Sequence, residues 1–345
     1  MVLKVLELYS GIGGMHFALN ESGIKHEVVA AIDINPVCNA VYRHNFPNTK
    51  LIEKCLTSIF LKDFNKMSAD MILMSPPCQP FTTIGKQKDV HDERTKSFQY
   101  FLSILPKFSK LPGYILMENV KGIESSIMRG EFLKVLSQLN YDYQEFILDP
   151  TQFGIPNSRR RYYLLAKLQN VNSSLQTRPD ITYSLLRQND NSTTNISQTD
   201  DKSVLRPLRD FLEKQLPEYF EKFRLPKKLY KKYWLMDLVS ENSKSCCCFT
   251  KGYGRYVEKA GSIFQTSPSE VDLFPYKNHE SDEQFVAEVD KLGLRFFTPR
   301  EIANFLCFPS TFEFPANLNI QQQYRVLGNS LNVHVVSMLL KLLCS

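Results

Sequence analysis

Short apolar segments alternate with longer amphipathic segments through the first half of the chain. The apolar segments have the length of buried strands, and they cover residues 2–8, 28–32, 71–74, 114–117, 146–148 and 162–167. Helical periodicity follows the first two, over residues 15–21 and 36–44, and the later gaps are long enough for crossover helices. This repeating order predicts an α/β fold with a doubly wound, mostly parallel sheet.

The pattern changes after this first half. Residues 169–202 are dense in Ser, Asn, Gln, Thr and Asp, a composition that buries little surface and predicts a mobile linker. Residues 205–240 are amphipathic and predict two or three helices. Regular structure is expected again near the C-terminus, where Thr298 and Glu301 have the spacing of a capping box and residues 333–343 predict a last helix.

These changes predict three parts. Residues 1–168 form the first domain, residues 169–292 form a smaller inserted domain, and residues 293–345 return to the first domain.

Composition narrows the class of protein. Of 345 residues, 43% are hydrophobic and 23% are charged, which is ordinary for a globular chain with a buried core. The net charge of +6 permits contact with phosphates without requiring it. The sequence shows neither a signal-peptide pattern nor an apolar run expected to span a membrane. The eight cysteines include no Cys-x-x-Cys pair, so we expect an intracellular protein without a bound metal.

A glycine-rich turn follows the first predicted strand. It comprises Ser10, Gly11, Ile12, Gly13 and Gly14. Glycines at this place let the backbone turn tightly and let a ligand lie against a helix N-terminus. Asp33 ends the second strand, where an acid can accept hydrogen bonds from ribose hydroxyls, and the neighbouring Ile34 can pack on an adenine. A helix-capping Asp and a core Ile are the alternative interpretation.

Three prolines surround Cys78 in the loop after the strand at residues 71–74. Prolines stiffen a loop, and here they would hold the cysteine at the carboxyl edge of the sheet, where open α/β sheets bind ligands. A cysteine thiolate is a strong nucleophile near neutral pH. A buried structural cysteine in a proline-rich turn is the alternative.

Charged side chains follow the next two strand signals. Glu118 closes an apolar strand, and partial burial would raise its pKa and make it a usable proton donor. Arg159 and Arg161 lie two residues apart on an incipient strand and therefore share a face, from which two guanidinium groups can bind a carbonyl oxygen and a phosphate. A strand-end cap and a solvated basic edge strand are the alternatives.

Taken together and in this order, the motifs resemble those of the cytosine-5 methyltransferases. The resemblance rests on the glycine turn, Asp33, Pro-Pro-Cys-Gln at 76–79, Glu-Asn-Val at 118–120, Arg-x-Arg at 159–161 and Gly-Asn-Ser at 328–330. It implies the fold of S-adenosylmethionine-dependent methyltransferases, with S-adenosylhomocysteine as product and no metal.

The resemblance also implies roles for individual residues. Cys78 would be the nucleophile, Glu118 and Arg161 would hold the cytosine ring, and Arg159 would steady the catalytic loop or the backbone. The cofactor residues would be Ser10 to Gly14 together with Asp33, Ile34, Leu56, Thr57, Asn329 and Ser330. The substrate contacts would be Pro77, Gln79, Asn119, Lys251 and Tyr253.

A closer resemblance points to one branch of this family. Residues 248–254, Cys-Phe-Thr-Lys-Gly-Tyr-Gly, are similar to the signature of the type-2 eukaryotic branch. That resemblance implies a tRNA methyltransferase for cytosine 38 of aspartate tRNA, with DNA as a weak second substrate. We expect a monomer in the cytoplasm, with the nucleus as a second location. The chain departs from the pattern at Lys259-Ala260, where Gly-Thr is expected, and at Cys55, where many bacterial relatives have Asp.

Three other functions remain open from the sequence. A DNA cytosine-5 methyltransferase would have the same active site. A non-catalytic nucleic-acid-binding protein would keep the fold, although the intact Cys78, Glu118 and Arg161 argue against it. A nicotinamide-dependent oxidoreductase is disfavoured because the third glycine of its phosphate-binding turn is missing. Two lysine pairs, at 227–228 and 231–232, with Tyr230 and Tyr233 between and after them, are a candidate RNA contact or a solvated helix face.

Overall fold

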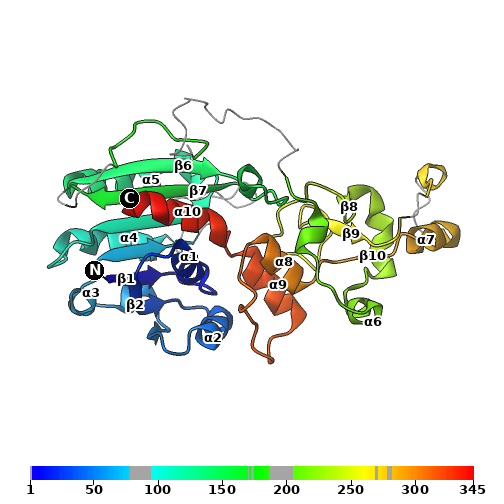
Figure 1. Cartoon of the computed structure of the whole chain (residues 1–345), viewed down its shortest axis with the longest axis horizontal. Helices are drawn as coiled ribbons and strands as arrows, with labels where there is room; N and C mark the ends of the chain where they lie inside the picture. Colours follow the sequence, from blue (N-terminus) through cyan, green and yellow to red (C-terminus); the bar gives the residue numbers. More distant parts are fainter. Residues whose placement is uncertain are drawn as a thin grey trace.

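A mostly parallel sheet forms the larger part of the computed structural model, which describes residues 2–77, 95–169, 171, 175–185, 205–268, 271–277 and 282–345. The strand order is β3-β2-β1-β4-β5-β7-β6 (Figure 1). The strands are β1 (Leu3–Leu8), β2 (His26–Ile32), β3 (Leu51–Ile52), β4 (Met71–Met74), β5 (Tyr114–Val120), β6 (Tyr141–Leu148) and β7 (Arg161–Leu168). Strand β7 is antiparallel to both β5 and β6, and the other pairs are parallel. The predicted sheet is confirmed.

Helices cover both faces of this sheet. They are α1 (Gly14–Ser22), α2 (Pro36–Asn45), α3 (Leu61–Met67), α4 (Lys96–Ile104), α5 (Ile127–Gln138) and α10 (Val333–Cys344). Alternate residues of β1 enter two separate cores: Val5 packs in the core that includes α1 and α10, whereas Leu6 packs in the core that includes α4 and α5. The C-terminal helix α10 lies against α1 and β7, beside the large sheet (Figure 1).

A smaller part of the molecule lies at the other end of Figure 1. Its sheet has the order β10-β9-β8, with β8 (Leu238–Val239), β9 (Ile263–Gln265) and β10 (Leu294–Arg295). Helices α6 (Pro217–Phe220), α7 (Glu283–Asp290), α8 (Pro299–Phe305) and α9 (Ile320–Gly328) surround it. The two or three helices predicted at 205–240 are one short α-helix and three 3-10 helices. Pro207, Pro217 and Pro226 stand at or just before the start of three of these helices. Because proline lacks a backbone N–H and breaks a continuous helix, the segment folds as several short helices.

The predicted mobile linker is too broad. Within it, residues 175–185 run along β6: Ile147 donates a backbone hydrogen bond to Thr182 at 2.9 Å, and Thr182 donates one to Glu145 at 2.8 Å. Residues 186–202 lie outside the described residues. The boundaries proposed at 168 and 292 stay predictions.

One expectation about apolar segments needs correction. The span Ile320–Cys344 has the length and hydropathy of a membrane-crossing helix, so the prediction that the chain has no apolar run of that kind is wrong. In the structure it is divided between α9 and α10, and 67% of its most apolar window is buried inside the protein. That burial is also typical of core helices.

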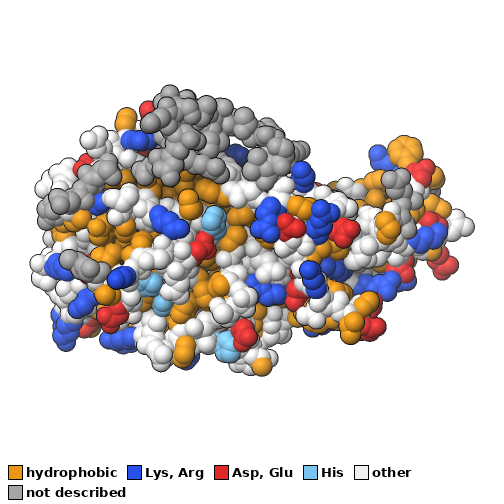
Figure 2. Space-filling model, in the orientation of Figure 1, with side chains coloured by type: hydrophobic (Ala, Val, Ile, Leu, Met, Phe, Trp, Pro, Cys, Tyr) orange, Lys and Arg blue, Asp and Glu red, His pale blue; other side chains and the backbone are white. Residues whose placement is uncertain are grey.

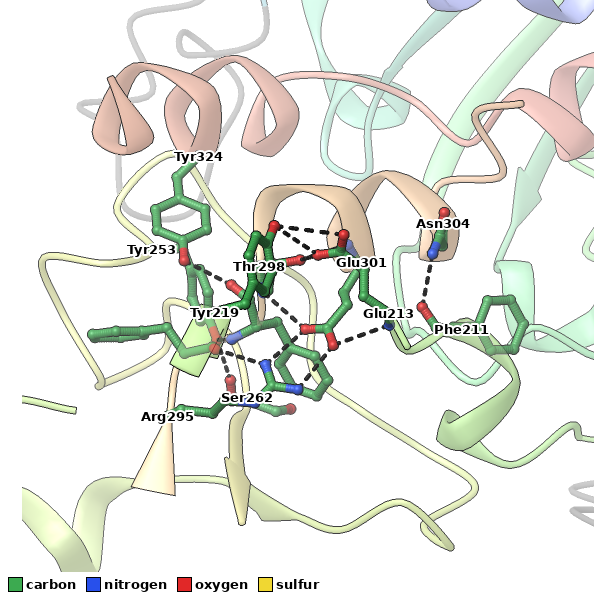
Figure 3. A network of polar contacts seen from close by, with 12 residues as sticks. Phe211, Glu213, Tyr219, Tyr253, Ser262, Arg295, Thr298, Glu301, Asn304 and Tyr324 are labelled. Atoms are coloured by element: carbon green, nitrogen blue, oxygen red, sulfur yellow. Dashed lines mark hydrogen bonds and ion pairs between the residues drawn. The ribbon is translucent and has the colours of Figure 1, made fainter. Parts of the chain in front are cut away.

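A buried ion pair joins β10 to the start of α8 (Figure 3). Arg295 makes two hydrogen bonds to Glu301, at 2.7 and 2.8 Å, and both side chains are buried. Thr298 caps α8 by accepting from the Glu301 backbone, and Glu301 accepts from the Thr298 backbone in return. The predicted capping box is therefore confirmed, and its glutamate also fixes the small sheet.

Candidate active site

The predicted motifs meet at one edge of the large sheet. The parallel strands β1, β2 and β4 lead, at their carboxyl ends, into the glycine turn, Asp33 and the Ser75–Pro77 segment, and Glu118 and Asn119 lie in the last residues of the parallel strand β5. Strand β1 lies between β2 and β4, so the chain changes direction across the sheet beside the glycine turn. Such a switch point is where open α/β sheets bind ligands.

A cavity of about 390 Å³ opens at this edge. Its lining includes Asp33, Ile34, Leu56 and Thr57, four of the predicted cofactor residues, together with Pro77. It also includes residues that the sequence analysis did not select as cofactor-binding: Tyr9, Ile32, Lys54, Cys55, Lys96 and Ser97. A larger cavity, of about 570 Å³, is lined by none of the predicted site residues.

Tyr9 is the missed residue that the sequence could have indicated. It follows β1 directly, inside the turn motif, and it has a positive φ of 56°, which is rare for a residue with a side chain. Its hydroxyl donates a hydrogen bond to Ser97 at 3.0 Å. The turn therefore places an aromatic ring on the cavity wall.

Asp33 holds the glycine turn in place. Its carboxylate accepts from the backbone N–H of Gly11 at 2.9 Å and from that of Asn35 at 2.8 Å. Burial raises the pKa of Asp33, and these backbone hydrogen bonds partly oppose the increase. Gly11 and Gly13 adopt positive φ angles of 55° and 85°, so the turn needs residues without a side chain. The predicted ribose contact of Asp33 stays a prediction.

The residues at this edge fit an adenosine-type cofactor. Ile34 is 66% exposed although it is apolar, and it lines the cavity, as an adenine-packing side chain should. The buried Ser10 hydroxyl has no hydrogen-bond partner among the described residues. A side chain added at Gly11 would meet open space, so a ligand has room beside the turn. Ser330 lies against Gly14, which brings the C-terminal motif to the same turn. Asn329 is exposed next to it.

Glu118 and Arg161 form a pair at the end of β5. The Arg161 Nε lies 3.5 Å from a Glu118 carboxylate oxygen, and the Glu118 side chain is only 10% exposed. Burial raises the pKa of Glu118, while the guanidinium groups of Arg161 and Arg159 oppose the increase. The pairing follows from the register of β5 with β7, in which Val120 faces Arg161. A carboxyl with a raised pKa beside a cation can donate a proton and offset a charge on a substrate.

Arg159 is held by a different set of contacts. It is 2% exposed and donates to the Cys248 thiol at 3.3 Å, the Phe249 carbonyl at 3.2 Å, and the carbonyls of Gly328 (3.1 Å) and Ser330, while its buried Nε has no partner among the described residues. These contacts agree with the steadying role that the resemblance implies for Arg159, and its part in catalysis stays a prediction. Arg161 begins β7 with its side chain at Glu118, whereas Arg159 precedes the strand and is buried against the two C-terminal motifs.

Cys248 is held by the same arginine. Burial disfavours a charged thiolate, but Arg159 and Arg161 outweigh it and lower the pKa of this thiol. Gly328 explains how closely the two motifs pack, since a side chain there would come within 2.3 Å of the Thr250 and Lys251 backbone. The Cys-Phe-Thr-Lys segment and the Gly-Asn-Ser segment thus lie against each other behind the Glu118–Arg161 pair.

Asn119 connects β5 to the loop that leads to the predicted nucleophile. Its amide donates to the Pro76 carbonyl at 3.2 Å, and its oxygen accepts from the Val120 N–H at 2.8 Å. Asn119 is 2% exposed and these bonds give it a positioning role, while its predicted substrate contact stays a prediction. Cys78 and Gln79 lie outside the described residues.

The two substrate residues predicted in the smaller part differ. Lys251 is exposed, as a substrate contact requires. Tyr253 is 1% exposed; its hydroxyl donates to the Ser262 carbonyl at 2.7 Å and accepts from the Phe297 N–H at 2.9 Å (Figure 3). The resemblance implied a substrate contact, whereas the Tyr253 ring is part of the core. The described residues contain no group of three or more His, Cys, Asp or Glu placed to hold a metal.

Comparison with known proteins agrees with this geometry. The sequence model of the C-5 cytosine-specific DNA methylases matches residues 3–344. The chain belongs to this family. Members use S-adenosylmethionine, and four of the predicted cofactor residues line the cavity at the carboxyl edge of the sheet.

Individual relatives cover the chain from end to end. It is 44% identical to the Bos taurus tRNA (cytosine(38)-C(5))-methyltransferase, with 99% of each chain covered. It is 38% identical to a Dictyostelium discoideum protein named DNA (cytosine-5)-methyltransferase, covering 99% of this chain and 94% of the relative. The crystal structure of a Spodoptera frugiperda DNMT2 variant superposes with a TM-score of 0.85 at 42% identity, covering 99% of this chain and all of that one. The family resemblance and the fold inferred from the sequence are confirmed.

Proposed function

We propose that this chain transfers a methyl group from S-adenosylmethionine to carbon 5 of a cytosine in tRNA. The buried Glu118–Arg161 pair carries the proposal for the chemistry, because it lies at the carboxyl end of β5, on the same edge of the sheet as the cofactor cavity. The bovine relative's name carries the proposal for tRNA and for position 38. Aspartate tRNA, a monomeric state, and a cytoplasmic location with a nuclear one as second remain our proposals from the sequence resemblance.

Carbon 5 of cytosine is a weak nucleophile, so the ring needs activation. The Cys78 thiolate would add to carbon 6, which makes carbon 5 an enamine-like nucleophile. Glu118, whose raised pKa favours its protonated form, would donate to ring N3, and Arg161 would hold the O2 carbonyl. When bound, S-adenosylmethionine supplies the methyl group and leaves as S-adenosylhomocysteine. A base, for which water is our candidate, then removes the carbon-5 proton, and the Cys78 thiolate is expelled.

An RNA loop suits such a pocket physically. The target base must leave its stack to reach the cysteine, and this costs less free energy for an unpaired loop base than for a base in a duplex. In the lysine-pair segment, Tyr230 is 1% exposed and its hydroxyl donates to Asp290, so its ring is not available for stacking; RNA contact by the exposed Lys228 and Lys231 stays a prediction. Lys227 and Lys232 are also paired with acids, at 3.2 and 2.5 Å. Basic and acidic side chains are interspersed over the face that Figure 2 shows, so its coloured side chains form no single continuous basic patch.

DNA is the second candidate substrate. The Dictyostelium relative's name and the family description favour it. Both candidates share the active site, so only a direct comparison of substrates separates them.

The test uses the full chain, labelled S-adenosylmethionine, total tRNA and duplex DNA, with Cys78→Ala in parallel. Label that enters aspartate tRNA with the wild type and not with Cys78→Ala supports both substrate and nucleophile. Label confined to DNA would retain the chemistry and refute the tRNA proposal. Label that persists in Cys78→Ala would refute the nucleophile.

A further inference from the structure

A closed loop next to the Glu118–Arg161 site carries an exposed aromatic ring among unpaired cations. Thr250 donates a backbone hydrogen bond to Ala260 at 2.8 Å, which closes the loop at residues 250–260. Within it, Tyr256 is 62% exposed, one of the more exposed large hydrophobic side chains among the described residues. Burial of an aromatic ring is normally favourable, so a ring that stays exposed to solvent is a candidate contact surface.

The Tyr256 ring is held rather than free. The Tyr256 backbone N–H donates to the Gly252 carbonyl at 3.1 Å, as does that of Arg255. A side chain added at Gly252 would come within 3.1 Å of the Tyr256 ring, so the ring lies against the glycine backbone. With one side supported in this way and most of its surface exposed, the ring is a rigid, low-entropy contact surface.

The loop itself is anchored to the core and to the active site. Tyr253, at its centre, is fixed by hydrogen bonds to the Ser262 and Phe297 backbone (Figure 3). Cys248 and Phe249 directly precede the loop, and Arg159 donates to the thiol of the first and to the carbonyl of the second. An extended residue spans at most about 3.6 Å, and Gly252 follows Cys248 by four residues. Gly252, against which the Tyr256 ring lies, is therefore within roughly 14 Å of Cys248.

Cations surround the ring on the same loop. Lys251 and Lys259 are exposed and make no ion pair among the described residues, and the Arg255 side chain donates to the neutral Gln321 side chain at 3.3 Å. The one acid in the loop, Glu258, is neutralised by Lys232 at 2.5 Å. An aromatic ring flanked by unpaired cations is the combination that binds single-stranded nucleic acid, by stacking on a base and contacting its phosphates.

We infer that Tyr256 stacks on an unpaired base of the RNA substrate close to the target cytosine, while Lys251 and Arg255 contact the adjoining phosphates. The inference rests on the proposed tRNA substrate. It makes Tyr256 a specificity-determining residue for an unpaired loop, because a base inside a duplex does not present its face. Lys259, which departs from the branch pattern, adds charge at the same place.

The test measures steady-state methylation and equilibrium binding of an aspartate tRNA transcript by the full chain. We expect Tyr256→Ala to raise KM and Kd by about 5- to 100-fold, the usual effect of losing one stacked base, and Tyr256→Phe to behave as wild type. Tyr183→Ala is the matched control, since Tyr183 is 52% exposed elsewhere. Lys251→Ala should lower the slope of log Kd against log salt by about one.

The variants distinguish stacking by Tyr256 from a nonspecific surface effect. If Tyr256→Ala matches Tyr183→Ala, or if Tyr256→Leu binds as well as Tyr256→Phe, stacking is refuted. If the wild type binds tRNA through Tyr256 but does not methylate it, the proposed function fails and the contact survives. A wild type that neither binds nor methylates tRNA overturns both. Unchanged thermal unfolding of each variant shows that folding is not the cause.

Discussion

The side-chain amide of Asn119 donates a hydrogen bond to the carbonyl oxygen of Pro76 at 3.2 Å. This bond joins the end of β5, which carries Glu118, to the segment that leads to Cys78. One amide therefore couples the position of the proton donor to that of the predicted nucleophile, and its burial excludes water from the coupling.

Asn119→Ala should impair catalysis more than folding. Loss of the bond to Pro76 lets the following loop move, and a displacement of about 1 Å costs on the order of 100-fold in kcat. Affinity for S-adenosylmethionine should be unchanged. Asn304→Ala is the control, since Asn304 also donates to a backbone carbonyl, that of Phe211, at 2.8 Å. Equal kcat values for the two variants would contradict the positioning role.

Arg159→Lys and Arg161→Lys should differ in what they damage. Arg159 serves four acceptors from one buried guanidinium, which a lysine cannot reproduce, so we expect a loss of stability of about 2–4 kcal/mol. Arg161→Lys should lower kcat and leave the unfolding free energy nearly unchanged. Chemical denaturation and single-turnover methylation measure the two effects. A stable Arg159→Lys with low kcat would support a catalytic role for Arg159.

Gly328→Ala should destabilise the protein. The added carbon would lie 2.3 Å from the Lys251 backbone nitrogen, so the two C-terminal motifs must separate, at a cost of roughly 1–3 kcal/mol. Gly130→Ala is the opposite case: Gly130 lies inside α5 with open space around it, and alanine should stabilise the helix by up to about 1 kcal/mol. Thermal unfolding of both variants tests the contrast, and shifts of the same sign would refute it.

Ile34→Ala should weaken binding of S-adenosylmethionine without affecting the fold. The side chain is mostly exposed, so its removal costs little stability, but it would lose apolar contact with the cofactor, raising Kd about 10-fold. Ile127→Ala, at an isoleucine that is 60% exposed and lies outside the cavity lining, provides the comparison. Calorimetric titration with S-adenosylhomocysteine measures both. Equal affinities would remove Ile34 from the cofactor site.

Glu7 should make stability depend on pH. Burial raises the pKa of this carboxyl from 4.5 to about 8, although Tyr42 opposes the shift. The folded chain therefore holds the proton more tightly than the unfolded chain, and stability falls as pH rises from 4.5 to 8, by up to about 1.4 kcal/mol per pH unit.

The neighbouring His16 sets the best pH range for this test. Burial lowers its pKa to about 3, so its own contribution to stability increases up to pH 6.5 and is constant above it. Urea denaturation between pH 6.5 and 8 should show a decline in the wild type and a smaller one in Glu7→Gln. Parallel pH profiles for the two proteins would refute the assignment.

Local patterns in the sequence were enough for the large sheet and for part of the site. Strand and helix periodicities are properties of neighbouring residues, so β1, β2, β4, α2 and α10 were predicted close to their bounds. The glycine turn, Asp33 and Glu118 each follow a strand, and parallel strands bring their carboxyl ends together, so the sequence alone determined that these residues share one edge.

Only the tertiary structure decided which of the motif residues are buried and what they bond to. Arg159, Asn119 and Tyr253 stand in motifs beside exposed residues, yet each is buried and bonded to a segment far away in the chain: Arg159 to residues 248–249 and 328–330, Asn119 to Pro76, and Tyr253 to Phe297. Exposure of Tyr256 depends likewise on how the loop closes. Burial and hydrogen-bond partners are set by packing between distant segments, and no local periodicity records that packing.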